Sequence, residues 1–307
     1  MKIFSIFDDF PQEACRMITD AGIELTVLAK GTARPCGEGL KRIFLEYDGI
    51  IIGTGQKMTE DFFLNLQTKK IIATASTGID HIHIPDEKKN FVTVLNTPDV
   101  NSSSVCEYIL AVLFSRFHKY EEGMESYSLN LTRPKPSELS GKTVGIIGAG
   151  SIGTLLARQL SAFDVKILQW TAHPEKHTND TALLGEDVFV SMDELCRRSD
   201  AVVVAIPQLS STNNFFSSNF CSLLKSNCVF VGVSRVSVYD VDSLIEKAKN
   251  NLNFSLCLDI DFYKELSDKT KSMKNVFLTP HIAGGTIEAR KRMFFECAEN
   301  IVNHVMN

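Results

Sequence analysis

Short apolar runs rich in β-branched residues alternate along this chain with longer stretches whose apolar residues recur at helical spacing. A first series of runs covers residues 2–7, 24–29, 49–53, 70–75 and 93–96. A second series covers residues 143–148, 165–170, 201–206, 227–234, 255–260 and 275–279. Strands that alternate with helices are typical of parallel βαβ units. The pattern therefore predicts an α/β protein with two doubly wound parallel sheets.

The length of the chain agrees with two domains. It has 307 residues, and a single hydrophobic core rarely grows beyond about 250–300 residues. A linker is indicated at residues 130–142, where two prolines interrupt a polar stretch. A final amphipathic helix is predicted from the spacing of Phe294, Cys297 and Ile301.

Composition narrows the classes of partner. The formal charge is -5 and Lys and Arg form no block, which argues against nucleic acid. No apolar stretch approaches the roughly 20 residues needed to span a bilayer, so a membrane partner is not expected. The eight cysteines lack a CxxC pair and are expected to be reduced, buried thiols of a cytoplasmic protein.

The most specific motif begins at Gly148, directly after an apolar run. Gly148, Gly150 and Gly153 follow the spacing of the dinucleotide-binding fingerprint, and a helix-spaced apolar stretch comes next. The glycines let a strand turn sharply, admit a pyrophosphate against bare backbone and begin a helix whose amides attract phosphate. We therefore expect a dinucleotide here, with Ser151 and Ile152 in the same turn.

Three further segments lie in a recognisable order. They are Ser-Thr-Gly-Ile-Asp at residues 76–80, Val-Ser-Arg at 233–235, and Thr-Pro-His-Ile-Ala-Gly-Gly-Thr at 279–286. With the mid-chain glycine motif, they resemble the D-2-hydroxyacid dehydrogenase family from about residue 50 onward.

The resemblance implies two Rossmann- or flavodoxin-like domains, with the cofactor domain inserted into a discontinuous substrate domain. We expect a substrate domain of residues 1–99 and 284–307 and a dinucleotide-binding domain of residues 100–283. It also implies a homodimer that moves a hydride between NAD(P)H and a small 2-oxo or 2-hydroxy acid.

That chemistry requires a proton donor and a fixed cation. A hydride added to a carbonyl carbon leaves an alkoxide, and histidine is the residue that donates a proton near neutral pH. His281 follows a strand at the carboxyl edge, where parallel α/β sheets bind ligands. Arg235 also follows a strand, and a guanidinium holds a carboxylate through two parallel hydrogen bonds.

The third group, a carboxylate beside His281, departs from the family pattern. The family glutamate would match Lys264, whereas Glu265 stands one residue later. We predict Glu265 as the partner of His281, with Asp261 as the alternative. A second departure is Val236, where the family has glycine after the arginine; a β-branched residue there resists positive φ.

The resemblance assigns further contacts. Backbone amides around Thr77 and Gly78 are expected to hold the substrate carboxylate. Asp259 is expected to contact the nicotinamide amide, while Pro207 and Thr212 are expected to lie near the cofactor.

The choice of nicotinamide depends on the end of the second strand of the dinucleotide domain. NAD-specific folds place an acidic residue there, about 20 residues beyond the glycines. This chain has Thr171 instead, followed by His173, Lys176 and His177, which can donate to a phosphate. The sequence therefore favours NADP slightly over NAD.

Two other functions are compatible with these residues. A nucleotide-sensing or corepressor-like protein would keep the fold without catalysis, consistent with Val236 and the displaced Glu265. A formate or phosphite dehydrogenase would use the same arginine. No metal site is predicted.

Overall fold

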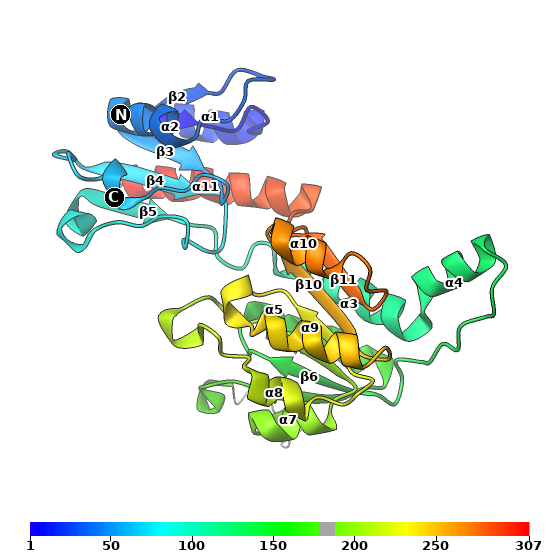
Figure 1. Cartoon of the computed structure of the whole chain (residues 1–307). Helices are drawn as coiled ribbons and strands as arrows, with labels where there is room; N and C mark the ends of the chain where they lie inside the picture. The colour runs from blue at the N-terminus through cyan, green and yellow to red at the C-terminus, as the bar shows by residue number, and fades with distance from the viewer. Residues whose placement is uncertain (178–187, 307) are drawn as a thin grey trace. The chain divides into compact units, whose positions relative to one another are not determined.

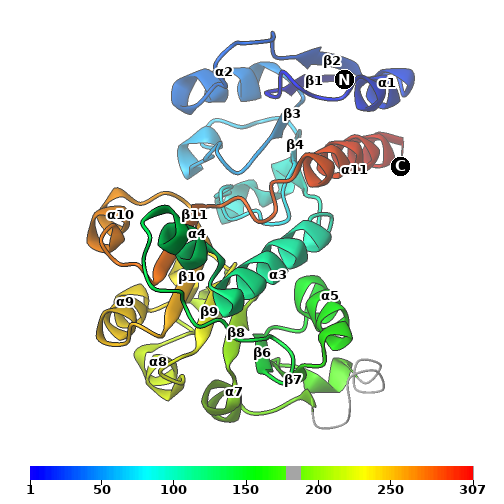
Figure 2. The ribbon, with the colours of Figure 1, turned by 90° about the vertical axis from the view of Figure 1, so that its right-hand side faces the viewer.

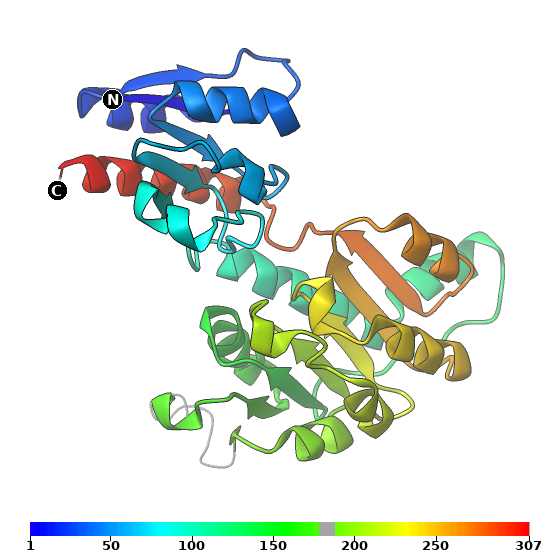
Figure 3. The same ribbon diagram turned by 60° about the vertical axis from the view of Figure 1, so that its left-hand side comes forward.

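The computed structural model describes residues 1–177 and 188–306, and the chain divides into two compact units. One unit combines Met1–Asn101 with Thr286–Asn307, and the other is Ser102–Gly285. Each unit is built on one sheet of parallel strands with helices around it (Figures 1 and 3). The predicted fold class is therefore confirmed.

The first unit has a five-stranded sheet in the order β2-β1-β3-β4-β5. Its strands are β1 (Lys2–Ser5), β2 (Glu24–Val27), β3 (Gly49–Ile52), β4 (Lys70–Thr74) and β5 (Val92–Leu95). Its helices are α1 (Gln12–Asp20), α2 (Gly37–Glu46) and α11 (Ile287–Met306), with short 3₁₀ turns η1 (Glu60–Phe62) and η2 (Asp86–Phe91). All residues of β3 and β4 are buried, and residues 50–52 and 71–73 are accordingly apolar.

Helix α11 comes from the far end of the chain and packs on this first unit (Figure 2). The ring of Phe294 lies 4.8 Å from that of Phe7 and 5.1 Å from that of Phe10, centroid to centroid. Cys297 and Ile301 enter the same core at the predicted helical spacing. The last helix thus completes a core whose other members lie in the first hundred residues.

The second unit has a six-stranded sheet in the order β11-β10-β9-β8-β6-β7. Its strands are β6 (Thr143–Ile147), β7 (Lys166–Trp170), β8 (Ala201–Val204), β9 (Val229–Gly232), β10 (Ser255–Ile260) and β11 (Val276–Pro280). Its helices include α3 (Ser102–His118), α4 (Tyr120–Ser128), α5 (Ser151–Leu160), α7 (Met192–Arg198), α8 (Ser218–Leu223), α9 (Val241–Asn250) and α10 (Lys264–Thr270). Short 3₁₀ turns are η3 (Ser161–Phe163), η4 (Pro174–Lys176), η6 (Ser210–Thr212) and η7 (Val236–Val238).

Two hydrophobic cores cover the two faces of this second sheet. One is formed by α3 and α5 against one set of strand side chains. The other is formed by α7, α8, α9 and α10 against the alternate set. Because successive side chains of a strand point to opposite faces, both sets must be apolar in a doubly wound sheet.

The glycine turn follows β6, which lies between β8 and β7 where the strand order reverses. Gly148 has φ +115°, a region that favours glycine, and a Cβ there would come 2.5 Å from the Ala205 carbonyl oxygen. A Cβ on Gly153 would come 2.1 Å from the Gly148 carbonyl oxygen. Gly150, the N-cap of α5, has open space at the same position. The first and third glycines are therefore required by the turn itself, and the second is not.

All eight cysteines are free, and six of them are buried. Burial raises the pKa of Cys106 and Cys196 to about 12, so these thiols serve as small apolar packing groups. Within residues 1–177 and 188–306, no helix has the length and apolar content to cross a membrane.

The glycine geometry gives a matched pair of variants. In Gly153→Ala the added Cβ would clash with the Gly148 carbonyl oxygen, so the backbone must shift. This variant should lower the free energy of unfolding by about 2 kcal/mol or more. In Gly150→Ala the added Cβ has no atom within 4 Å. This variant should lower the free energy of unfolding by about 1 kcal/mol or less, which is the difference between alanine and glycine at an N-cap. Urea denaturation followed by circular dichroism measures both. Equal losses in the two variants would contradict this account of the turn.

Candidate active site

His281 directly follows β11 in an unusual backbone conformation. Its φ is +53°, in the left-handed region, and its backbone N–H donates to the Thr279 carbonyl at 2.9 Å. Histidine enters this region more readily than most residues other than glycine. The tight turn leaves the imidazole about one third exposed.

Asp259, in β10, stabilises the turn that contains His281 through hydrogen bonds. Its buried carboxylate accepts hydrogen bonds from the backbone N–H groups of Ile282 and Ala283, each at 2.8 Å. It also accepts the hydroxyl proton of Thr279 at 2.6 Å. Three donors thus satisfy the buried charge, and two of them fix the chain just after His281.

Helix α3 reaches the same network through Tyr108. The Tyr108 hydroxyl lies 2.7 Å from Thr279 Oγ1, and because the Thr279 proton goes to Asp259, Tyr108 is the donor in this contact. Burial raises the pKa of Tyr108 to about 12, which keeps the phenol protonated for that role.

The imidazole of His281 lies between a cation and a carboxylate. Arg235 Nη1 is 2.8 Å from Nε2, and Asp261 Oδ1 is 2.9 Å from Nδ1. A guanidinium only donates, so Nε2 accepts in this contact and carries no proton. The ring proton is then on Nδ1, where it is donated to Asp261. The arrangement is that of a neutral imidazole oriented by its carboxylate partner.

The predicted pairing of Glu265 with His281 is not the one the structure makes. Glu265 lies in the first turn of α10 with a side chain 85% exposed, and it forms an ion pair with Lys269 at 3.5 Å. The pair has the i,i+4 spacing that places two side chains on one helix face. Asp261, the alternative named from the sequence, contacts the imidazole because it precedes the helix and follows β10 directly.

Arg235 is supported by the residues on either side. The Ser234 N–H donates to the Tyr239 hydroxyl at 2.8 Å, and Ser234 Oγ donates to the Ile206 carbonyl at 2.7 Å. These bonds join the loops after β9 and β8. Val236 begins the 3₁₀ turn η7 without a positive φ and packs on the core, so the crowding expected from a β-branched residue does not arise.

The glycine turn fits an anionic dinucleotide. A Cβ added to Gly150 would have no atom within 4 Å, so the backbone of this residue is open to a ligand. The Gly148 carbonyl is fixed by a buried hydrogen bond of 2.9 Å from Gln169 Nε2. Ser151 and Ile152 form the first turn of α5, whose N-terminal amides attract phosphate.

The other cofactor candidates lie in loops after the strands of the same sheet. Thr171 follows β7, and its hydroxyl accepts from the His173 N–H at 3.3 Å. Thr212 donates to the Pro207 carbonyl at 2.7 Å, which closes the loop after β8. Because the sheet is parallel, these loops, the glycine turn, Arg235 and His281 share its carboxyl edge.

Thr77 and Gly78 belong to the first unit, in the loop after β4. The Thr77 carbonyl accepts from Asn96 Nδ2 at 2.8 Å, and the Gly78 carbonyl accepts from Ser76 Oγ at 2.7 Å. Both carbonyls are therefore held by side chains of the same unit.

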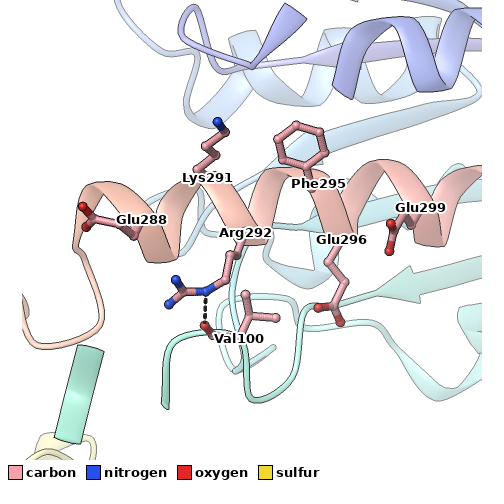
Figure 4. Close-up of a pocket in the computed structure, with 7 residues that line it drawn as sticks. All are labelled: Val100, Glu288, Lys291, Arg292, Phe295, Glu296 and Glu299. Atoms are coloured by element: carbon pink, nitrogen blue, oxygen red, sulfur yellow. Dashed lines mark hydrogen bonds between the residues drawn. The ribbon is translucent and has the colours of Figure 1, made fainter. Parts of the chain in front are cut away.

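A groove of about 590 Å³ runs along α11 in the first unit (Figure 4). Arg292 Nε donates to the Val100 carbonyl at 3.1 Å across it. Glu288, Glu296 and Glu299 line the groove, and in the part of the chain that the structure describes no group of residues could hold a metal ion.

Sequence reasoning missed Tyr108, Thr279 as a hydrogen-bond bridge, and the pair of Ser234 and Tyr239. Thr279 lies within the motif that ends in His281, which was a usable signal. No local sequence pattern indicates a role for Tyr108, because its hydrogen-bond partner, Thr279, is 171 residues away in the sequence.

Comparisons with known proteins show the family to which the chain is similar. The family model of the D-isomer specific 2-hydroxyacid dehydrogenase, NAD binding domain, matches residues 108–283. The glyoxylate reductase of Thermofilum pendens is 29% identical over 282 residues, which cover 87% of this chain and 81% of that protein. The hydroxypyruvate reductase of Thermotoga maritima is 28% identical over 269 residues, or 85% of this chain and 86% of that protein.

Among solved structures, an acyclic imino acid reductase (Bsp5) in complex with NADPH and D-Arg has a TM-score of 0.85 and 25% sequence identity. That similarity covers 100% of this chain and 97% of the other.

Proposed function

Because the chain belongs to the D-isomer specific 2-hydroxyacid dehydrogenase family, we propose that it reduces a small 2-oxo acid to its 2-hydroxy acid, and catalyses the reverse reaction, with NAD(P). In this proposal Ser102–Gly285 is the dinucleotide-binding domain and the other unit is the substrate domain. The observation that carries the proposal is the imidazole of His281 held between Arg235 and Asp261.

Each of the three side chains has a distinct role. The nicotinamide supplies or accepts the hydride when it is bound. Arg235 binds the substrate carboxylate and polarises the carbonyl, and His281 donates a proton from Nε2 to the carbonyl oxygen. Asp261 holds the ring by Nδ1 and stabilises the imidazolium form.

The substrate must also release Nε2 from Arg235. A protonated Nε2 and a guanidinium N–H are both donors and cannot face each other at 2.8 Å. A 2-oxo acid resolves this conflict, since its oxygens accept from both groups. The oxygens of the substrate thus replace the direct contact between Arg235 and Nε2.

The direct test is oxidation of NADH and NADPH, followed by absorbance, with glyoxylate, hydroxypyruvate, pyruvate, phenylpyruvate and phosphorylated 2-oxo acids. Turnover of at least one acid supports the proposal. Cofactor binding without turnover of any of them would favour a nucleotide-sensing protein instead. Reduction of NAD(P) by formate or phosphite, without activity on any 2-oxo acid, would indicate a formate or phosphite dehydrogenase.

The partner of His281 is tested by a matched pair of carboxylate variants. Asp261→Asn should lower kcat about 10- to 100-fold and move the pH optimum of 2-oxo acid reduction downward, because the imidazolium loses its stabilising charge. Glu265→Gln should keep the activity and the pH profile within about twofold of wild type, as expected of a residue paired with Lys269. The assignment is wrong if the effects of the two variants are reversed.

For the cofactor we propose NADP with a slight preference over NAD. Thr171 replaces the acidic residue that would repel a 2′-phosphate, and the segment after it holds His173 and Lys176. Thr171→Asp should weaken NADPH binding about 10-fold or more and leave NADH binding within about threefold. Fluorescence titration measures both dissociation constants. An equal loss for the two cofactors would remove Thr171 from the phosphate site.

We also propose that the protein is a homodimer. The segment around α4 exposes five large apolar side chains: Tyr120, Met124, Tyr127, Leu129 and Leu131. Clustered exposed apolar residues of this size mark association surfaces. Light scattering should give twice the chain mass of 34.1 kDa, and Tyr127→Glu with Leu131→Glu should give the single mass. A monomeric wild type would contradict the proposal.

A further inference from the structure

The loop after β4 contains a chain of hydrogen bonds between buried side chains. His81 Nε2 lies 3.0 Å from Thr74 Oγ1, and Thr74 Oγ1 lies 2.8 Å from Ser76 Oγ. Ser76 Oγ lies 2.7 Å from the Gly78 carbonyl oxygen. Thr74, Ser76 and His81 are all at least 94% buried.

Proton counting fixes the direction of every bond in this chain. The Gly78 carbonyl only accepts, so the single hydroxyl proton of Ser76 is donated to it. The Thr74 hydroxyl must then donate to Ser76. Its oxygen is left as an acceptor, so the His81 ring donates from Nε2. The chain runs one way, from the His81 ring to the Gly78 carbonyl.

The chain holds the peptide unit that joins Gly78 and Ile79. Because a trans peptide is planar, anchoring its carbonyl also fixes the direction of the Ile79 N–H. The preceding peptide is held in the same manner, since Asn96 Nδ2 donates to the Thr77 carbonyl and so fixes the Gly78 N–H. Donors that act in series polarise one another, which makes the terminal amide a stronger donor.

These two N–H groups are available to a ligand. Within residues 1–177 and 188–306, neither the Gly78 N–H nor the Ile79 N–H donates to another group of the chain. Gly78 is half-buried and Ile79 is exposed. Successive backbone N–H groups that are held in place can together bind an anionic oxygen.

We propose that His81, Thr74 and Ser76 are positioning residues, which fix and polarise the Ile79 N–H. Together with the Gly78 N–H, which Asn96 fixes, it binds the carboxylate of the 2-oxo acid. The inference rests on the proposed function and names further determinants of its substrate affinity. None of the three side chains touches the substrate; they act through the Gly78 carbonyl.

The test breaks the chain at each link. Ser76→Ala and Thr74→Val each remove one hydroxyl with little change in volume, and His81→Leu removes the first donor. His81→Gln retains a side-chain N–H donor. Thr97→Val is the matched control, because Thr97 is also fully buried in this unit and, within the part of the chain that the structure describes, its Oγ1 makes no hydrogen bond.

The expected result is a selective loss of affinity for the acid. Ser76→Ala, Thr74→Val and His81→Leu should raise KM for the 2-oxo acid about 10-fold and leave kcat within about threefold. The dissociation constant of oxamate, an unreactive analogue of 2-oxo acids, should rise in parallel. NAD(P)H affinity should be unchanged, His81→Gln should lie closer to wild type than His81→Leu, and Thr97→Val should match wild type.

Two results would overturn the inference. One is a KM and an oxamate affinity within twofold of wild type in both Ser76→Ala and Thr74→Val. The other is a joint loss of NAD(P)H affinity and acid affinity, which a general folding defect produces. If the wild-type enzyme turns over none of the acids, the proposed function fails, and oxamate affinity alone then decides the inference.

Discussion

The buried carboxylate of Asp259 is the constraint on which the candidate active site depends. It accepts from two successive backbone N–H groups and from Thr279, and so keeps the chain after β11 in a tight turn. Without these bonds the left-handed backbone of His281 would have no compensation for its conformational cost. The contacts of the imidazole with Arg235 and Asp261 follow from that backbone. The buried position of Asp259 is thus explained by its support of the turn, independently of any contact with a nicotinamide.

The fold was predictable because short runs rich in β-branched residues alternate with helix-spaced stretches along the chain. All eleven predicted strands occur in the described part of the chain, and strands such as β3, β8 and β9, in which every residue is buried, give the clearest apolar runs. Gly148 and Gly153 were predictable because no other residue fits the turn. Arg235 and His281 were predicted as site residues because each follows a strand at the carboxyl edge of one sheet and lies in a segment that resembles the family.

The parts that could not be predicted depend on loop geometry and on distant contacts. Glu265 and Asp261 are both carboxylates after β10, and only the start of α10 at Lys264 decides which one faces His281. That start turns Glu265 toward Lys269. The hydrogen bond between Tyr108 and Thr279 joins α3 to β11, and no local sequence pattern predicts it. The direction of the bonds from His81 to Gly78 depends on the positions of four groups at once.

In each of the two units, buried polar groups hold a turn in place through hydrogen bonds. Asp259 does this for the His281 turn, and the chain from His81 through Ser76 does it for the Gly78 turn. In both, a hydrogen bond that stabilises the fold also sets the direction of a group that can meet a ligand.

The left-handed backbone at residue 281 restricts which amino acids can occupy that position. Apart from glycine, the residues that enter this region most readily are asparagine, aspartate and histidine. A proton donor for an alkoxide near neutral pH is found among them only in histidine. The backbone conformation and the proposed reaction each restrict, independently, which amino acids can occupy position 281. Histidine satisfies both restrictions.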